Sequence, residues 1–236
     1  MFLSSRKLKL LISIFFSILL VSCSAKYSKS SYEELAQNSQ NYESINLNNL
    51  MLSLLAADKN LTPKLIYNPD GSSFYRYTIK PGEGEISFKE IKKRVSLGSD
   101  FYKTDREKIK TLLTRINKLK INNKLDHIDI GALGLWIPNK DLIVIDYRVI
   151  MMGSPTFLDI LRHEVIHVAQ SCFSSSRKNF PKRIGLPLEF SRDINFNLSH
   201  KVYSKNSEEV MYLEREAFTY SKIDGAAIKL LNKFCN

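Results

Sequence analysis

The stretch Ile160-Leu161-Arg162-His163-Glu164-Val165-Ile166-His167-Val168 decides how the rest of this chain is interpreted. Histidines four residues apart lie one turn from each other on the same face of an α-helix, so the imidazoles of His163 and His167 can bind a single metal ion. The flanking residues are mostly apolar, and charged groups are rarely left without partners in a core. The segment therefore predicts a buried helix that carries a metal site.

Glu164 directly follows the first histidine and suggests hydrolytic chemistry at such a site. In hydrolytic zinc sites three protein ligands leave the fourth position to water, and a glutamate in this place serves as general base. The spacing thus predicts Zn²⁺ as cofactor, His163 and His167 as ligands and Glu164 as the catalytic base. The alternative is that both histidines are hydrogen-bonded core residues and that Glu164 is an ordinary helix carboxylate.

Residues 160–169 resemble the metal-binding helix of the zincin metallopeptidase superfamily. Metzincins continue with a glycine and a third histidine at the positions that Gln170 and Phe173 occupy here, so that branch is excluded. The gluzincin branch takes its third ligand from a glutamate on a later helix. The resemblance implies an α+β, zincin-like fold, in which a small mixed sheet with an edge hairpin packs on the active-site helix and a second, C-terminal helix supplies a ligand.

The segment Tyr212-Leu213-Glu214-Arg215-Glu216-Ala217-Phe218 resembles the Glu-x-x-Ala-Asp segment of several small gluzincin families. The resemblance implies Glu214 as third ligand and Ala217 as the small residue that lets the two helices approach. Phe218 departs from the pattern, which usually has an Asp or Asn there to support a zinc-bound histidine. Glu216 is the alternative ligand, about 200° around the helix from Glu214, so only one of them can face the metal. Both glutamates could also belong to a solvated acidic patch.

Zinc hydrolysis also calls for a hydrogen-bond donor to the developing oxyanion. His200 is one candidate, although it lies in a stretch rich in Asn and Ser that predicts a loop. Tyr220, Tyr203 and Tyr212 are others, and the sequence does not rank them.

Two apolar runs, residues 133–137 and 142–147, flank Pro138-Asn139-Lys140-Asp141 and predict a β-hairpin. Zincins bind substrate as an added strand along a sheet edge, so the resemblance implies that this hairpin provides that edge. Ser154-Pro155 predicts the beginning of the active-site helix, with Ser154 as its N-cap. Farther upstream, Asn68-Pro69-Asp70-Gly71 predicts a turn between two strands.

Residues 1–22 predict a secretory signal, in which basic residues precede an apolar run from Leu10 to Val21 that is short for a membrane span. Leu20-Val21-Ser22-Cys23 resembles a bacterial lipobox. This implies cleavage before Cys23, lipidation of that cysteine and a polar tether that reaches residue 43. An ordinary signal peptide or a retained anchor is the alternative. The protein is expected in the bacterial cell envelope, lipid-anchored to the membrane and facing the periplasm or the exterior.

The remaining residues, 44–236, are enough for one core and predict a single domain. The formal charge is +11, of which the signal carries three positive groups. No run interleaves aromatic residues with Lys or Arg, so nucleic acid is not an expected partner, and the charge favours an anionic membrane surface. Cys172 and Cys235 remain once Cys23 is assigned to lipid, and in an oxidising compartment they could form one disulfide.

Together these features predict a zinc metallopeptidase of the cell envelope that hydrolyses a peptide bond in a peptide or protein substrate. One alternative is a non-catalytic lipoprotein of the same fold that serves as an envelope binding or assembly module. A protein that binds or stores metal without hydrolysis is another.

Overall fold

The computed structural model describes residues 44–77, 86–129, 131–200, 203 and 206–235. The predicted signal, Cys23 and the tether lie outside the described residues. Within the part that is described, no helix has both the length and the hydropathy that crossing a membrane requires. Helices combine with two small sheets, so the protein is α+β.

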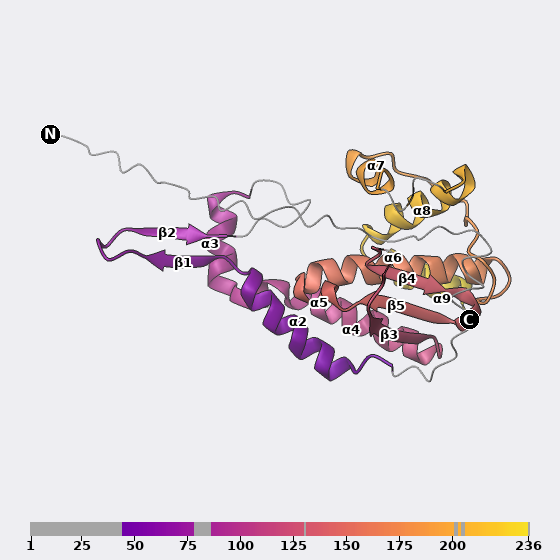
Figure 1. The fold of residues 1–236 in the computed structure, drawn as a ribbon, viewed down its shortest axis with the longest axis horizontal. Helices are drawn as coiled ribbons and strands as arrows, with labels where there is room; N and C mark the ends of the chain where they lie inside the picture. The colour runs from indigo at the N-terminus through magenta and orange to yellow at the C-terminus, as the bar shows by residue number, and fades with distance from the viewer. Residues whose placement is uncertain (1–43, 78–85, 130, 201–202, 204–205, 236) are drawn as a thin grey trace.

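The N-terminal part consists of one helix, a β-hairpin and two further helices. Helix α2 (Leu47–Leu61) precedes strands β1 (Lys64–Tyr67) and β2 (Ser73–Arg76), which pair antiparallel around the predicted Asn68–Gly71 turn. Gly71 takes the left-handed φ of 78° that this turn requires. Figure 1 shows this hairpin projecting away from the body of the molecule. The helices that follow are α3 (Phe88–Leu97) and, after a 3₁₀ turn at Gly98–Tyr102, α4 (Lys103–Lys118).

The second sheet contains β3 (Asn122–Asp126), β4 (Gly134–Ile137) and β5 (Leu142–Asp146) in the order β3-β5-β4. Strand β5 pairs parallel with β3 and antiparallel with β4, so the sheet is mixed and β4 lies at an edge. The predicted hairpin thus forms. Every residue of β4 and β5 is buried, which explains why their sequences are continuously apolar rather than alternating.

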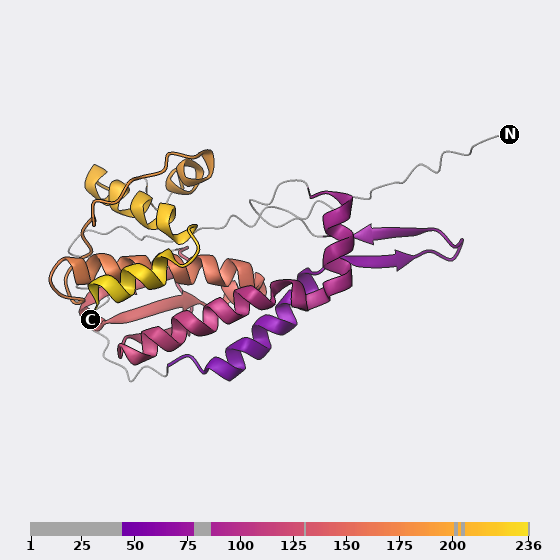
Figure 2. The ribbon, with the colours of Figure 1, turned by 180° about the vertical axis from the view of Figure 1, so that it is seen from behind.

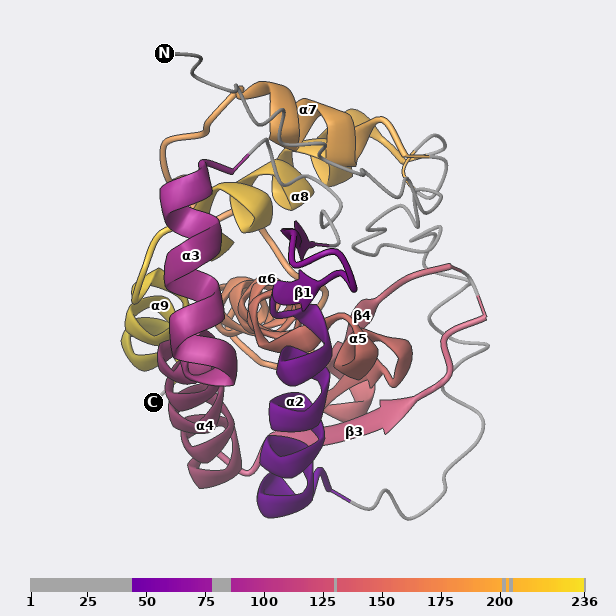
Figure 3. The same ribbon diagram turned by 90° about the vertical axis from the view of Figure 1, so that its left-hand side faces the viewer.

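Helix α6 (Gly153–Phe173) is the centre of the molecule. It follows a short helix, α5 (Arg148–Met151), and precedes α7 (Arg192–Leu198), α8 (Glu208–Ser221) and α9 (Ala226–Phe234). Figure 2 shows α4 and α9 beside α6 on the face away from the viewer of Figure 1. In Figure 3, α6 is seen end-on with α2, α4, α8, α9 and the sheet around it. This enclosure explains why α6 is apolar on nearly all sides.

The beginning of α6 differs from the prediction that Ser154 is its N-cap. The helix begins at Gly153, whose φ is 83°, and Ser154 is a buried residue within its first turn. The backbone N–H and the hydroxyl of Ser154 donate to the carboxylate of Asp58 on α2, at 2.8 and 2.7 Å. A carboxylate distant in sequence therefore caps this helix, and local sequence patterns do not reveal such a partner.

Candidate metal centre

His163 and His167 project from the same face of α6, as their spacing predicts. Their side chains are 1 % and 4 % exposed, and the two Nε2 atoms lie 3.0 Å apart. The rings meet edge to face, with centroids separated by 4.7 Å. Both imidazoles therefore direct Nε2 toward the same point.

Glu214 reaches this point from α8. Its Oε2 atom lies 3.2 Å from Nε2 of His163 and 3.3 Å from Nε2 of His167. Ala217, one turn farther along α8, is fully buried and part of the main core, consistent with its predicted role as the small residue between the helices. Within the described part of the chain, His163, His167 and Glu214 are the one group of His, Cys, Asp or Glu side chains that converges closely enough to hold a metal ion.

The triangle of ligand atoms fits a zinc ion. Tetrahedral zinc binds nitrogen and oxygen at 2.0–2.1 Å, which places neighbouring ligand atoms about 3.3 Å apart. The three separations of 3.0, 3.2 and 3.3 Å are close to this value. The donor set of two imidazoles and one carboxylate is one that zinc accepts in catalytic sites.

Glu216 lies elsewhere, on the side of α8 that faces the segment after α6. It accepts hydrogen bonds from the backbone N–H groups of Ile184, Gly185 and Leu186, each at 2.9 Å, and is fully buried. Of the two glutamates that the sequence left as alternatives, the structure brings only Glu214 to the histidines. Neither belongs to a solvated acidic patch.

Gln170 holds His167 in the orientation needed for metal binding. Its Oε1 lies 2.8 Å from Nδ1 of His167, while its Nε2 donates to the backbone oxygen of Leu213 and to Glu216. The amide nitrogen has these two acceptors, so Oε1 must face the imidazole. In its neutral form the imidazole then carries its proton on Nδ1 and leaves the Nε2 lone pair for a metal. Sequence reasoning missed this residue. Its spacing of three residues from His167 was the available signal.

His163 lacks such support. Its Nδ1 is buried and has no hydrogen-bond partner among the described residues. The ring packs against Phe218, with centroids 4.4 Å apart. Phe218 is the residue that departs from the pattern of the families that the sequence resembles. His163 also lines a cavity of about 110 Å³ between α6, α7 and α8, together with Asn197 and Ser221.

Glu164 points between α6 and strand β4. It accepts a hydrogen bond from the backbone N–H of Trp136, whereas its Oε1 has no partner among the described residues. Burial raises the pKa of this carboxyl to about 8. Gly134 allows the close approach, because a Cβ at that position would lie 2.6 Å from Oε1 of Glu164.

His167 and Glu214 carry opposite charges in the metal-free protein, and each stabilises the ionised form of the other. Burial favours the neutral form of His167, but the neighbouring Glu214 carboxylate outweighs this and raises the pKa of His167 to about 9. Burial likewise disfavours ionised Glu214, yet the two histidines lower its pKa to about 2. Burial lowers the pKa of His163.

The four candidate oxyanion donors lie at different distances from the centre. Tyr203 is buried and its ring contacts Phe218, which in turn packs on His163. His200 follows α7, in a turn where its backbone oxygen accepts from the N–H of Tyr203. Tyr212 packs under Arg183, and Tyr220 lies on the side of α8 that carries Glu216. Tyr203 is therefore linked to the centre through a single intervening side chain.

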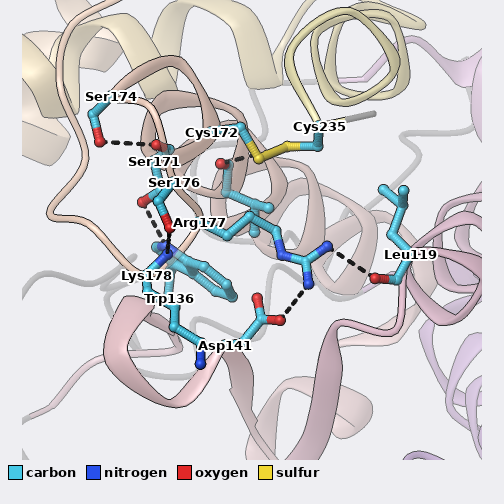
Figure 4. Close-up of a disulfide and its surroundings, with 11 residues drawn as sticks. Leu119, Trp136, Asp141, Ser171, Cys172, Ser174, Ser176, Arg177, Lys178 and Cys235 are labelled. Carbon is cyan, nitrogen blue, oxygen red and sulfur yellow. Dashed lines mark hydrogen bonds and ion pairs between the residues drawn. A yellow bond between two sulfur atoms is a disulfide. The ribbon is translucent and has the colours of Figure 1, made fainter.

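The sulfur atoms of Cys172 and Cys235 are joined in a disulfide between the end of α6 and the end of α9, with Cα atoms 5.3 Å apart (Figure 4). The bond anchors the end of α9 beside α6. Arg177, four residues after the end of α6, donates to Asp141 in the turn before β5. Comparison with protein-family models, with curated proteins and with solved structures found no match for this chain.

Proposed function

We propose that this protein is a zinc-dependent peptidase of the bacterial cell envelope, with His163, His167 and Glu214 as metal ligands. The convergence of two Nε2 atoms and one carboxylate oxygen, at separations of 3.0–3.3 Å, carries this proposal. Zinc bound there would supply activation of water and polarisation of a substrate carbonyl.

Glu164 acts as the general base in the proposed reaction. Its Oε1, which has no partner among the described residues, can accept a proton from the attacking water. The same carboxyl then returns the proton to the amine that leaves.

Strand β4 favours a peptide as substrate. It lies at the edge of the sheet and packs against α6 beside Glu164, so an extended peptide that displaced the cover of this buried strand and added to its edge would run past the proposed base. The disulfide supports an exported protein, because such bonds persist in oxidising compartments. The proposed lipid at Cys23 would hold the enzyme at the membrane.

Zinc content and peptide cleavage together test the proposal. We expect one zinc per chain in the purified wild type, in Glu164→Gln and in Glu209→Ala, an exposed control on α8, and loss of zinc in Glu214→Ala. Cleavage of a synthetic peptide mixture, followed by mass spectrometry, should disappear in Glu164→Gln and persist in Glu209→Ala. A wild type that takes up no zinc at neutral pH would overturn the proposal.

A non-catalytic envelope binding module is the second candidate. The Nδ1 of His163 favours it, since none of the described residues gives this proposed ligand an outer hydrogen bond. Full zinc occupancy without cleavage of any peptide in the mixture would support this alternative.

A further inference from the structure

We infer that Gln170 and Glu216 are positioning residues for His167, and that together they couple the segment 184–186 to the metal centre. We refer to their contacts as the Gln170–Glu216 bridge. The inference rests on the proposed zinc site, and it assigns to Glu216 a role that differs from that of a ligand.

The bridge begins at the imidazole of His167. Its Nδ1 lies 2.8 Å from Oε1 of Gln170, and the amide nitrogen of Gln170 donates to Glu216 at 2.9 Å and to the backbone oxygen of Leu213 at 3.2 Å. Gln170 is fully buried. Each polar atom of this amide therefore has a protein partner, and only one orientation of the amide satisfies them all.

Glu216 fixes that orientation and extends the bridge to the chain after α6. One of its oxygens accepts from Gly185 and Leu186, and the other accepts from Ile184 and from Gln170. A carboxylate can accept all four hydrogen bonds at once, whereas a neutral amide cannot. The segment 184–186 therefore holds Glu216, Glu216 holds the amide of Gln170, and that amide holds the imidazole of His167.

Loss of the bridge has a specific chemical consequence at His167. Without Glu216 as acceptor, the Gln170 amide can turn and present its NH₂ group to Nδ1. The imidazole would then carry its proton on Nε2, the atom that must bind the metal, and zinc could bind only after this tautomer is reversed. Outer partners of this kind typically change metal affinity about 10- to 100-fold.

The test compares the zinc affinity of three variants of the full chain with that of the wild type, measured by competition with a chromophoric chelator. Gln170→Ala and Glu216→Gln should each weaken zinc binding about 10- to 100-fold.

Thr219→Val is the matched control. Thr219 also lies on α8 and also holds the segment after α6, because its hydroxyl oxygen accepts from the backbone N–H of Glu189 at 3.1 Å. It has no contact with Gln170, so its replacement should leave zinc affinity within about twofold of wild type. As a second measurement, nitrogen-15 spectra of the zinc-loaded protein should show a slowly exchanging Nδ1 proton of His167 that is lost in Gln170→Ala.

Zinc affinities within twofold of wild type in Gln170→Ala and Glu216→Gln would overturn the inference. If Glu216→Gln fails to fold, Gln170→Ala and its Nδ1 proton still decide the matter, since that change leaves the backbone partners of Glu216 in place. A wild type that binds no zinc would instead contradict the proposed function itself.

Discussion

At the scale of single residues, the metal-free centre contains a protonated histidine beside a carboxylate, and the proposed zinc ion must replace that proton. His167 and Glu214 are both buried and form an ion pair, and each stabilises the ionised form of the other. A zinc ligand must be a neutral imidazole, so the proton on His167 competes with the metal.

We therefore expect zinc binding to release at least one proton per metal at pH 7. The pKa of His167 is about 9 in the metal-free protein, so this side chain is protonated at pH 7 and must lose its proton on binding. Zinc affinity should rise as the pH increases from 7 toward 9 and level off above that value. Calorimetric titrations in buffers of different ionisation enthalpy measure the released protons, and identical heats in all buffers would contradict the prediction.

Asp58 is a second buried charge on which the structure depends. Its carboxylate accepts from Ser154 at the beginning of α6 and pairs with Arg106 of α4, so one fully buried side chain connects three helices. Removing one partner of such a pair leaves the other without compensation.

Asp58→Ala should lower the free energy of unfolding by about 3–5 kcal/mol, measured by urea denaturation. Asp100→Ala is the matched control, since Asp100 approaches the same Arg106 at 4.0 Å but is 74 % exposed. A surface partner of this kind contributes about 0–1 kcal/mol. Equal effects of the two substitutions would show that burial does not determine the contribution of Asp58.

At the scale of elements, the contact between β4 and α6 sets the position of Glu164, the proposed base. Gly134 and Trp136 face α6, where the indole N–H of Trp136 donates to Ser171 at 2.9 Å. The alternate residues Leu135 and Ile137 face a separate small core on the other side of the sheet. The two faces of one strand therefore have different roles.

Gly134→Ala should lower both stability and peptide hydrolysis. The added Cβ would lie 2.6 Å from Oε1 of Glu164 and from Cγ2 of Ile160, so the strand or the carboxyl must move. We expect a loss of about 1–3 kcal/mol in the free energy of unfolding, typical of an overpacked core. Leu135→Val, on the opposite face, should cost about 1 kcal/mol and leave hydrolysis intact. Unchanged hydrolysis in Gly134→Ala would argue against this placement of Glu164.

At the scale of the whole molecule, the disulfide joins two segments that are distant in sequence. Figure 4 shows Cys172 and Cys235 beside Arg177, which donates to the backbone oxygen of Leu119 and to Asp141 in the turn before β5. The region thus links α4, the sheet, α6 and the C-terminus.

Replacing both cysteines by serine should lower the free energy of unfolding by about 4 kcal/mol, the chain-entropy value for the 63-residue separation. Urea denaturation with and without a reductant measures this difference. The wild type should lose stability on reduction, and the double variant should not respond. A wild type that is insensitive to reductant would indicate that the disulfide does not constrain the unfolded chain.

The sequence by itself determined the elements whose signals are local. The four-residue spacing of His163 and His167 gave their common face, because helical periodicity is a property of the backbone alone. The apolar runs around residues 138–141 predicted the β4–β5 hairpin, and Asn68–Gly71 predicted the turn between β1 and β2. The α+β class followed from these elements.

Only the tertiary structure decided which side chains complete the centre. The resemblance favoured Glu214 and left Glu216 as the alternative, and the packing of α8 on α6 turns Glu214 toward the histidines and Glu216 toward the segment 184–186. Gln170 can support His167 only because Glu216 and Leu213 orient its amide. In the same way, Asp58 of α2 caps the beginning of α6. Such contacts join residues far apart in the chain, and their geometry is set by how whole helices pack rather than by any local pattern.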